Sequence, residues 1–366
     1  MNNVKEPFIR ISRRTSIGRG KSWAIRLGSL FLALVVCGFL IFALTKLNPV
    51  RVYGAMWTGA FGSERKFWNT IRDTMMLLCI GVGLAPAFKM RFWNIGAEGQ
   101  ILVGGIVSAA CMIYWGDSMS TPLLLCIMAG ASLVAGGIWG LIPAVFKSRW
   151  NTNETLFTLM MNYVAIQLTS WCVSLWENPK GSNSVGIINL NSHGGWFPAI
   201  FGQQYVLNVI IVLAVTIGMF IYLRYSKQGY EIAVVGESEN TAKYAGIKVG
   251  RVITRTMILS GAVCGLAGFI AVAGASHTIS TSTAGGRGFT AIIIAWLAKF
   301  NTFVMILITL LLVFLEKGAT EIASRYDLNS YASQIITGII LFFILGSEFF
   351  INYELKFRSG KSKEVA

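Results

Sequence analysis

The chain has 366 residues, of which 54% are hydrophobic and only 13% are charged, and its formal net charge is +15 at pH 7. This composition excludes an ordinary soluble globular domain. A positive charge of this size is also found in nucleic-acid-binding proteins, so its distribution along the chain has to be examined.

A helix that crosses a lipid bilayer needs about 20 mostly apolar residues. In chain order, such stretches occupy residues 24–44, 70–88, 100–115, 121–146, 155–176, 204–223, 256–275, 303–315 and 331–350. The stretch 24–44 follows a basic region but has about two dozen residues before it and no small-residue cleavage site after it, so it is predicted to be an uncleaved anchor. The sequence therefore predicts an all-α polytopic membrane protein.

A further apolar segment, 288–297, is too short to span unaided. The glycine-rich stretch 276–287 before it leaves two interpretations open, a turn into a re-entrant helix or a plain exterior loop. Counting this segment, we predict about ten transmembrane or re-entrant helices.

More than two thirds of the 31 lysines and arginines fall on one side of the membrane if the N-terminus is cytoplasmic. This bias follows the positive-inside rule and predicts that both termini are cytoplasmic. The expected organisation is a basic N-terminal segment (1–23), a transmembrane domain (24–352) with a cytoplasmic loop (225–255), and a basic tail (353–366). No basic soluble face remains for nucleic acid.

Polar residues interrupt the apolar pattern just before the third predicted segment, where Phe92 and Trp93 precede Asn94, Glu98 and Gln100. Polar groups at membrane depth are costly and usually face a cavity or a partner. The glycines among them would allow a broken helix to approach a ligand. The alternative is an interfacial loop in which Glu98 interacts favourably with a helix N-terminus.

A second polar group lies at the start of the fifth segment. Asn153 can cap the helix, and Glu154 in the first turn suits the helix dipole. Asn162 lies about two turns further into an apolar helix, where it either forms hydrogen bonds between helices or lines a substrate path.

The predicted cytoplasmic loop contains a short helix that begins after Ser238 and ends before Gly246. Such a short helix is not stable alone, so it either docks on a partner protein or belongs to a surface linker. The candidate docking residues are Glu237, Ser238, Ala242, Tyr244, Ala245 and Gly246.

The glycines of segments 136–140 and 261–265 have the spacing of close helix contacts. No nucleophile with a base and an orienting partner can be assembled, and the phosphate-loop-like stretch 15–22 lacks its first glycine and a preceding strand. The chain is therefore not expected to be an enzyme, and uphill transport would take its energy from another chain or from an ion gradient.

Residues 92–100 and 153–163 resemble the signatures of permease subunits of ATP-binding-cassette importers, in the family that serves simple sugars, nucleosides and branched-chain amino acids. Residues 234–247 are similar to the segment by which such permeases contact their ATPase subunit. The resemblance covers about 69–346, and 92–100 looks like the nucleoside and simple-sugar branch. Residues 240–241 and 290–299 depart from the usual pattern, which weakens any inference about the exact substrate.

The resemblance implies a permease that moves a nucleoside by alternating access. The implied partners are a second homologous permease, an ATPase subunit that carries ATP and Mg²⁺, an extracellular substrate-binding lipoprotein and membrane lipid, with no cofactor on this chain and no nucleic acid. The expected location is the bacterial inner membrane, and the expected path residues are Phe92, Trp93, Asn94, Glu98, Gln100, Asn153, Glu154 and Asn162. The alternatives are an importer of a ribose-type sugar or a riboflavin-like molecule, and, in a different class, an ion-coupled secondary transporter.

Overall fold

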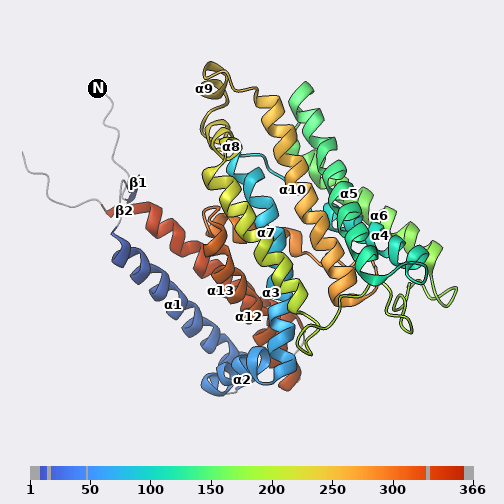
Figure 1. Cartoon of the computed structure of the whole chain (residues 1–366). Coiled ribbons are helices and arrows are strands. Elements are labelled where there is room, and N and C mark those ends of the chain that lie inside the picture. Colours follow the sequence, from blue (N-terminus) through green and yellow to red (C-terminus); the bar gives the residue numbers. More distant parts are fainter. Residues whose placement is uncertain (1–8, 15–17, 47, 327–329, 358–366) are drawn as a thin grey trace, which may run out of the picture. The chain divides into compact units, whose positions relative to one another are not determined.

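A computed structural model describes residues 9–14, 18–46, 48–326 and 330–357 (Figure 1). The helices are α1 (Arg19–Thr45), α2 (Pro49–Phe61), α3 (Glu64–Lys89), α4 (Ala97–Trp115), α5 (Thr121–Trp150), α6 (Glu154–Trp176), α7 (Val206–Tyr225), α8 (Lys227–Glu237), α9 (Glu239–Tyr244), α10 (Val249–Ala271), α11 (Arg287–Leu297), α12 (Thr302–Arg325) and α13 (Ser330–Asn352). A π-helical turn, η1 (Val272–Ser276), extends α10, and two strands are present, β1 (Ile9–Arg13) and β2 (Tyr353–Phe357). The predicted all-α polytopic architecture is confirmed.

Within the described residues, 8 helices are long and apolar enough to cross a membrane. They contain the predicted segments from 24–44 to 303–315, except that α7 begins at Val206, two residues after the predicted start of segment 204–223. The predicted segment 331–350 lies in α13. α11 has 11 residues and is a short apolar helix. Helix α2 was not predicted, because its 13 residues contain glycines and an arginine that break the apolar pattern.

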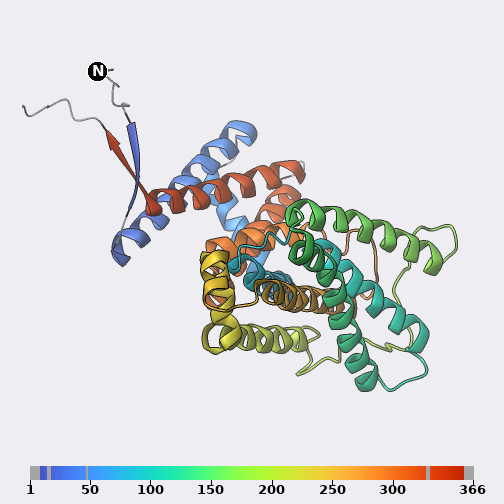
Figure 2. The same cartoon turned by 90° about the horizontal axis from the view of Figure 1, so that it is seen from above.

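The chain divides into two compact units, residues 64–313 and residues 1–63 with 314–366. In the first unit, α10 packs against α3, α4 and α5 (Figures 1 and 2). In the 18-residue apolar stretch of α3, 89% of the residues are buried, whereas in those of α5 and α7 only 28% are buried. α3 and α10 therefore form the core of this unit, and α5 and α7 present apolar faces outward, as helices in contact with lipid do.

Glycines allow α10 to approach its neighbours closely. A Cβ atom on Gly136 of α5 would lie 2.3 Å from the carbonyl oxygen of Gly261, and one on Gly104 of α4 would lie 2.2 Å from that of Gly265. Any larger side chain would push these backbones apart. The close helix contacts predicted from the glycine spacing are confirmed.

In the second unit, α1 packs along α13, and β1 pairs antiparallel with β2, with Arg13 opposite Tyr353. The Tyr53 hydroxyl of α2 donates to the Leu34 carbonyl oxygen of α1. The strand pairing places the two ends of the described chain on the same side of this unit. The strands were not predicted, because five-residue segments with mixed polarity give no signal until their distant partner is known.

Candidate functional site

The chain leaves the helical conformation between α3 and α4, at the polar segment singled out in the sequence. Two tight backbone turns form there, with Asn94 N donating to the Phe92 carbonyl oxygen (3.0 Å) and Ile95 N donating to that of Trp93 (3.1 Å). The chain becomes helical again only at Ala97. The two apolar helices are therefore joined by an irregular segment, 90–96, packed within the residue 64–313 unit.

Buried amide groups hold this break together. The Asn94 Nδ2 donates to Ser260 Oγ of α10 (3.2 Å) and to Gln100 Oε1 (3.3 Å), and Asn94 Oδ1 accepts from Gly96 N (3.1 Å). All three side chains, those of Asn94, Gln100 and Ser260, are buried. Their polar atoms thus bind one another and tie the break to α4 and α10.

Helix α6 contributes the matching contacts from the other side. Asn162 Oδ1 accepts from Gly99 N and its Nδ2 donates to the Ile95 carbonyl oxygen, both at 2.9 Å. Ile95 N donates to Thr158 Oγ1 (3.2 Å). Of the two interpretations of Asn162, the structure contains the hydrogen bonds between segments, and its lining of a substrate path stays a prediction.

Glu98 links the start of α4 to the start of α11. Its Oε1 accepts from Gly288 N (3.0 Å), and a Cβ atom on Gly288 would lie 2.9 Å from Glu98 N. The carboxylate therefore lies in the first turn of its own helix and against the first turn of α11, where both helix dipoles favour it. At 1.5 Å per residue, α11 is about 16 Å long, half of what a span requires. The two interpretations of 276–287, a turn into a re-entrant helix and a plain exterior loop, both stay predictions.

The remaining predicted path residues lie in other surroundings. Trp93 is 45% exposed and stacks on Trp296 of α11, with ring centroids 5.6 Å apart, whereas Phe92 is buried. Asn153 accepts from Leu156 N (3.1 Å) as the cap of α6, and Glu154 pairs with Lys147 (2.9 Å). The structure thus joins Asn94, Glu98, Gln100 and Asn162 around one break, and the local roles expected for Asn153 and Glu154 are present.

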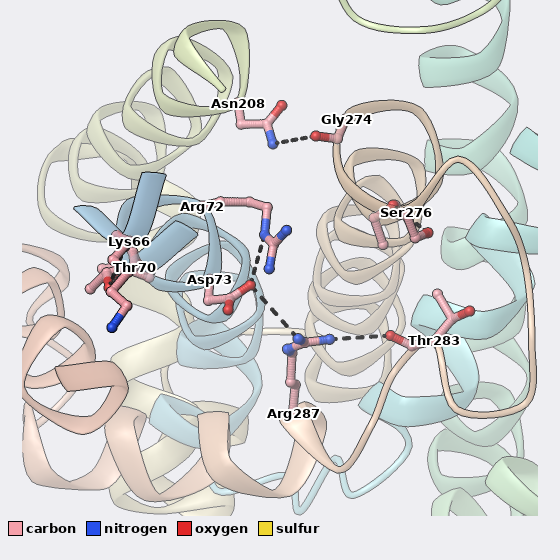
Figure 3. A network of polar contacts seen from close by, with 11 residues as sticks. Lys66, Thr70, Arg72, Asp73, Asn208, Gly274, Ser276, Thr283 and Arg287 are labelled. Carbon is pink, nitrogen blue, oxygen red and sulfur yellow. Dashed lines mark hydrogen bonds and ion pairs between the residues drawn. The ribbon is translucent and has the colours of Figure 1, made fainter. Parts of the chain in front are cut away.

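A charged cluster in the same unit was missed by the sequence analysis (Figure 3). Asp73 of α3 is 8% exposed, and its Oδ1 lies 2.9 Å from Arg72 Nε and 3.9 Å from Arg287 Nη2 at the start of α11. Arg287 Nη1 also donates to the Thr283 carbonyl oxygen (3.3 Å). Charges inside a spanning helix mark candidate functional sites. The available signal was the Arg72–Asp73 pair inside the predicted segment 70–88.

Arg72 also lines a cleft of about 560 Å³ between the first turns of α3 and residues 202–205. Trp68 and Tyr205 supply aromatic surface, and the Arg72 guanidinium lies 5.5 Å from the Tyr205 ring centroid. The other lining residues are Glu64, Arg65, Asn69, Gly202, Gln203 and Gln204. Aromatic walls with a few hydrogen-bonding groups suit a small polar molecule that has a flat ring. Among the described residues, no group of three or more side chains that could hold a metal ion comes together.

The predicted short cytoplasmic helix is α9. Ser238 Oγ accepts from Thr241 N (3.2 Å), and Gly246 after the helix has a φ of 76°, as predicted from the capping pattern. Tyr244 is 94% exposed, and Ala245, Gly246 and Glu237 are also exposed. Ala242 is fully buried, so this predicted docking residue supports α9 from within the chain and offers no surface to a partner.

Comparison with known families matches residues 67–345 to the family described as branched-chain amino acid transport system / permease component. A guanosine ABC transporter permease protein of Bacillus subtilis is 29% identical over 338 residues, covering 90% of this chain and 94% of the relative. A glucose ABC transporter permease protein of Haloferax volcanii is 26% identical, covering 88% and 87%. A nucleoside ABC transporter permease protein of Lactococcus lactis is 25% identical, covering 86% and 89%. No solved structure matches significantly.

Proposed function

Because the chain belongs to the family of branched-chain amino acid transport system permease components, we propose that it is the membrane-spanning subunit of an ATP-driven importer that translocates a nucleoside. Two of the relatives described above are named for guanosine and for nucleosides, which supports this substrate class. The observation that carries the proposal is the cleft that joins aromatic and hydrogen-bonding side chains to the charged cluster of α3 and α11.

The cleft matches the two halves of a nucleoside. The rings of Trp68 and Tyr205 offer faces on which a base can stack. The carboxylate of Glu64 and the amide of Asn69 can accept hydrogen bonds from ribose hydroxyls or base amino groups. We infer that a nucleoside enters here and passes Arg72, whose guanidinium belongs to both the cleft and the cluster.

The break around Asn94 is proposed as the element that changes conformation. Two helix starts, those of α4 and α11, meet there through Glu98 and Gly288. In a membrane protein, irregular backbone is tolerated where it is buried in protein or lines a cavity. A shift of α11 against α4 would exchange these contacts and open the path on one side while closing it on the other, which is alternating access.

The energy is proposed to come from an ATPase subunit that docks on α9. Its exposed Tyr244, with Ala245 and Gly246, offers the contact surface. Ala245→Arg would place a charged side chain in that contact, and we expect a permease that reaches the membrane normally but no longer couples ATP hydrolysis to uptake. Lys227→Arg on the same side of the unit serves as the control. Normal uptake by the Ala245→Arg variant would refute the docking role.

The remaining proposed partners are a second homologous permease and an extracellular substrate-binding lipoprotein. The loop 178–203 is the proposed receptor surface. It is anchored to the end of α10, since Ile188 N donates to the His277 carbonyl oxygen (2.8 Å), and it presents Phe201, which is 95% exposed. An anchored loop with a protruding aromatic side chain is suited to hold a partner.

Uptake measurements distinguish the substrates. Radiolabelled guanosine, uridine, ribose, glucose and riboflavin would be given to cells with the intact gene, with a deletion, and with the deletion complemented by this chain. We expect nucleoside uptake alone to be lost and restored. The glucose relative gives the sugar alternative a specific basis. Loss of sugar uptake with nucleoside uptake unchanged would support the permease function but show that the substrate is a sugar.

A further inference from the structure

The indole nitrogen of Trp139 in α5 is a buried hydrogen-bond donor without a partner. Trp139 Nε1 is closed off from solvent, and it makes no hydrogen bond to the residues that the structure describes. Buried indole N–H groups usually find an acceptor, and a buried polar group that lacks one calls for an explanation. The atoms that surround Trp139 Nε1 supply one.

Trp139 Nε1 lies where α4, α5 and α6 meet, beside the break between α3 and α4. A Cβ atom added to Gly99 of α4 would lie 3.0 Å from Trp139 Nε1, and 3.1 Å from both Asn162 Oδ1 and the Cβ atom of Ala165. A side chain at position 99 would therefore press against both the indole nitrogen and the Asn162 amide. Because residue 99 is glycine, a donor of α5 and an acceptor of α6 lie close together at the start of α4.

The acceptor, Asn162 Oδ1, has room for a second donor. Among the described residues, the donor that it binds is Gly99 N, at 2.9 Å. Gly99 is the third residue of α4, so its N–H has no carbonyl partner within the helix and depends on this side chain. An amide oxygen has two lone pairs, so Asn162 Oδ1 can accept from another N–H as well.

We propose that Trp139 is the alternative donor to Asn162 Oδ1 and that Gly99 N and Trp139 Nε1 form a switch at the break. In the arrangement described here, Asn162 binds the start of α4 and the indole N–H is unpaired. When the start of α4 moves away from α6, Gly99 N leaves Asn162 Oδ1 and Trp139 Nε1 takes its place. The amide oxygen then has a donor in both arrangements, which lowers the free energy of the second one.

The packing of α5 is suited to hold the indole still while α4 moves. Gly136 and Gly140, on either side of Trp139 in the sequence, bring the backbone of α5 against that of α10. A Cβ atom on Gly140 would lie 2.5 Å from the Met257 carbonyl oxygen. The inference rests on the proposed role of the break in alternating access and adds Trp139 to it as a positioning residue, which acts through Asn162 and need not touch the solute.

Hydrogen–deuterium exchange of the Gly99 amide in the purified full chain tests the switch, because the bond to Asn162 Oδ1 protects this amide only in the arrangement described here. Fragmentation of the labelled peptides by electron transfer assigns the deuterium to Gly99. Trp139→Phe removes the alternative donor, so the second arrangement is less populated and Gly99 should exchange about three- to tenfold more slowly. Trp139→His keeps a five-membered ring with an N–H at the same ring position, and Gly99 should exchange within about twofold of the unaltered chain.

Loss of packing alone predicts the opposite sign. Phenylalanine and histidine are both smaller than tryptophan, so a merely packed indole would loosen the site in both variants and make Gly99 exchange faster, most of all in Trp139→His. The matched control is Trp150→Phe at the end of α5, whose side chain is 62% exposed and which should leave the exchange of Gly99 unchanged. Faster exchange in Trp139→Phe, or equal exchange in Trp139→Phe and Trp139→His, would overturn the proposal.

Uptake by the assembled transporter separates this inference from the proposed function. We expect the maximal rate of uptake to fall in the order unaltered chain, Trp139→His, Trp139→Phe, with the KM for the solute within about twofold, because Trp139 affects the change of conformation and not the binding of solute. Exchange rates in the predicted order together with equal uptake by all three proteins would support the switch and overturn the proposed role of the break in transport.

Discussion

The hydrogen bonds of Asn162 give the most direct test of how the break between α3 and α4 is held. Asn162→Ala removes two bonds of 2.9 Å and leaves Gly99 N and the Ile95 carbonyl oxygen without their side-chain partner. Side-chain bonds between membrane helices contribute about 0.6 kcal/mol on average, and an orphaned buried backbone group costs about 1–3 kcal/mol. Because the surroundings relax in part, we expect the free energy of unfolding to fall by about 2 kcal/mol.

Asn162→Asp refines this prediction. A carboxylate can still accept from Gly99 N, but it opposes the Ile95 carbonyl oxygen with a second acceptor and brings a buried charge. The Asn162→Asp variant should therefore be no more stable than the Asn162→Ala variant. The control is Thr169→Ala in the same helix, whose hydroxyl donates to the Ala165 carbonyl oxygen one turn earlier. Unfolding in mixed detergent and denaturing detergent measures all three, and an Asn162→Ala loss no larger than that of Thr169→Ala would refute the bridging role.

Three further predictions concern charge, pH and packing. Asp73→Asn should lower the free energy of unfolding by about 1–3 kcal/mol, because Arg72 and Arg287, both partly exposed to solvent, lose the carboxylate that they share. In a double-mutant cycle, adding Arg287→Gln should restore part of the lost free energy of unfolding. Burial and the neighbouring His193 lower the pKa of His277 to about 4. The stability of the protein should therefore be constant above about pH 6.5 and fall between about pH 6.5 and pH 4, because only the unfolded state takes up the proton in this range. His277→Gln should flatten this dependence of thermal unfolding on pH. Gly136→Ala should lower the free energy of unfolding by about 1–3 kcal/mol, because the added methyl group forces α5 away from α10. The control is Gly130→Ala on the same helix, where an added Cβ atom meets nothing within 4 Å; it should be neutral or stabilising in the same unfolding assay.

How far the sequence predicts the fold depends on the range of the interaction. Spans such as 121–146 follow from local hydropathy, and the α5–α10 contact follows from glycine spacing on each helix. The strand pair β1–β2 joins segments at the two ends of the chain, and neither segment carries a local signal strong enough to predict it. The short length of α11 was visible in the sequence, but its orientation depends on contacts with Glu98 and Asp73 from two other helices.

The candidate site shows the same limit. Residue types in 92–100 indicated a polar break, because amides and a carboxylate in an apolar region need partners. Which partners they have is a tertiary property: Asn94 bonds to Ser260, 166 positions away. Arg72 and Asp73 were assigned to the apolar run 70–88 by average hydropathy, which conceals a charged pair. In the sequence Arg287 lies at the end of a glycine-rich loop, and only the fold brings it beside Asp73.

The half-helix α11 connects these observations. Its first turn meets Glu98 and Asp73, and its Trp296 stacks on Trp93 of the break. An element of about 16 Å whose first turn is held by carboxylates from α3 and α4 can exchange those contacts as a unit. We expect variants that lock or release its first turn to change transport more than they change membrane insertion.

The central claim, that this chain is a permease driven by a separate ATPase, is tested most directly by reconstitution. The chain would be placed in proteoliposomes with its ATPase, its paired permease and its receptor, and labelled guanosine transport would be followed with ATP on the ATPase side. We expect transport that requires ATP and the ATPase subunit and that is unaffected when the proton and sodium gradients are collapsed. Transport by this chain alone, driven by such a gradient without ATP, would contradict it.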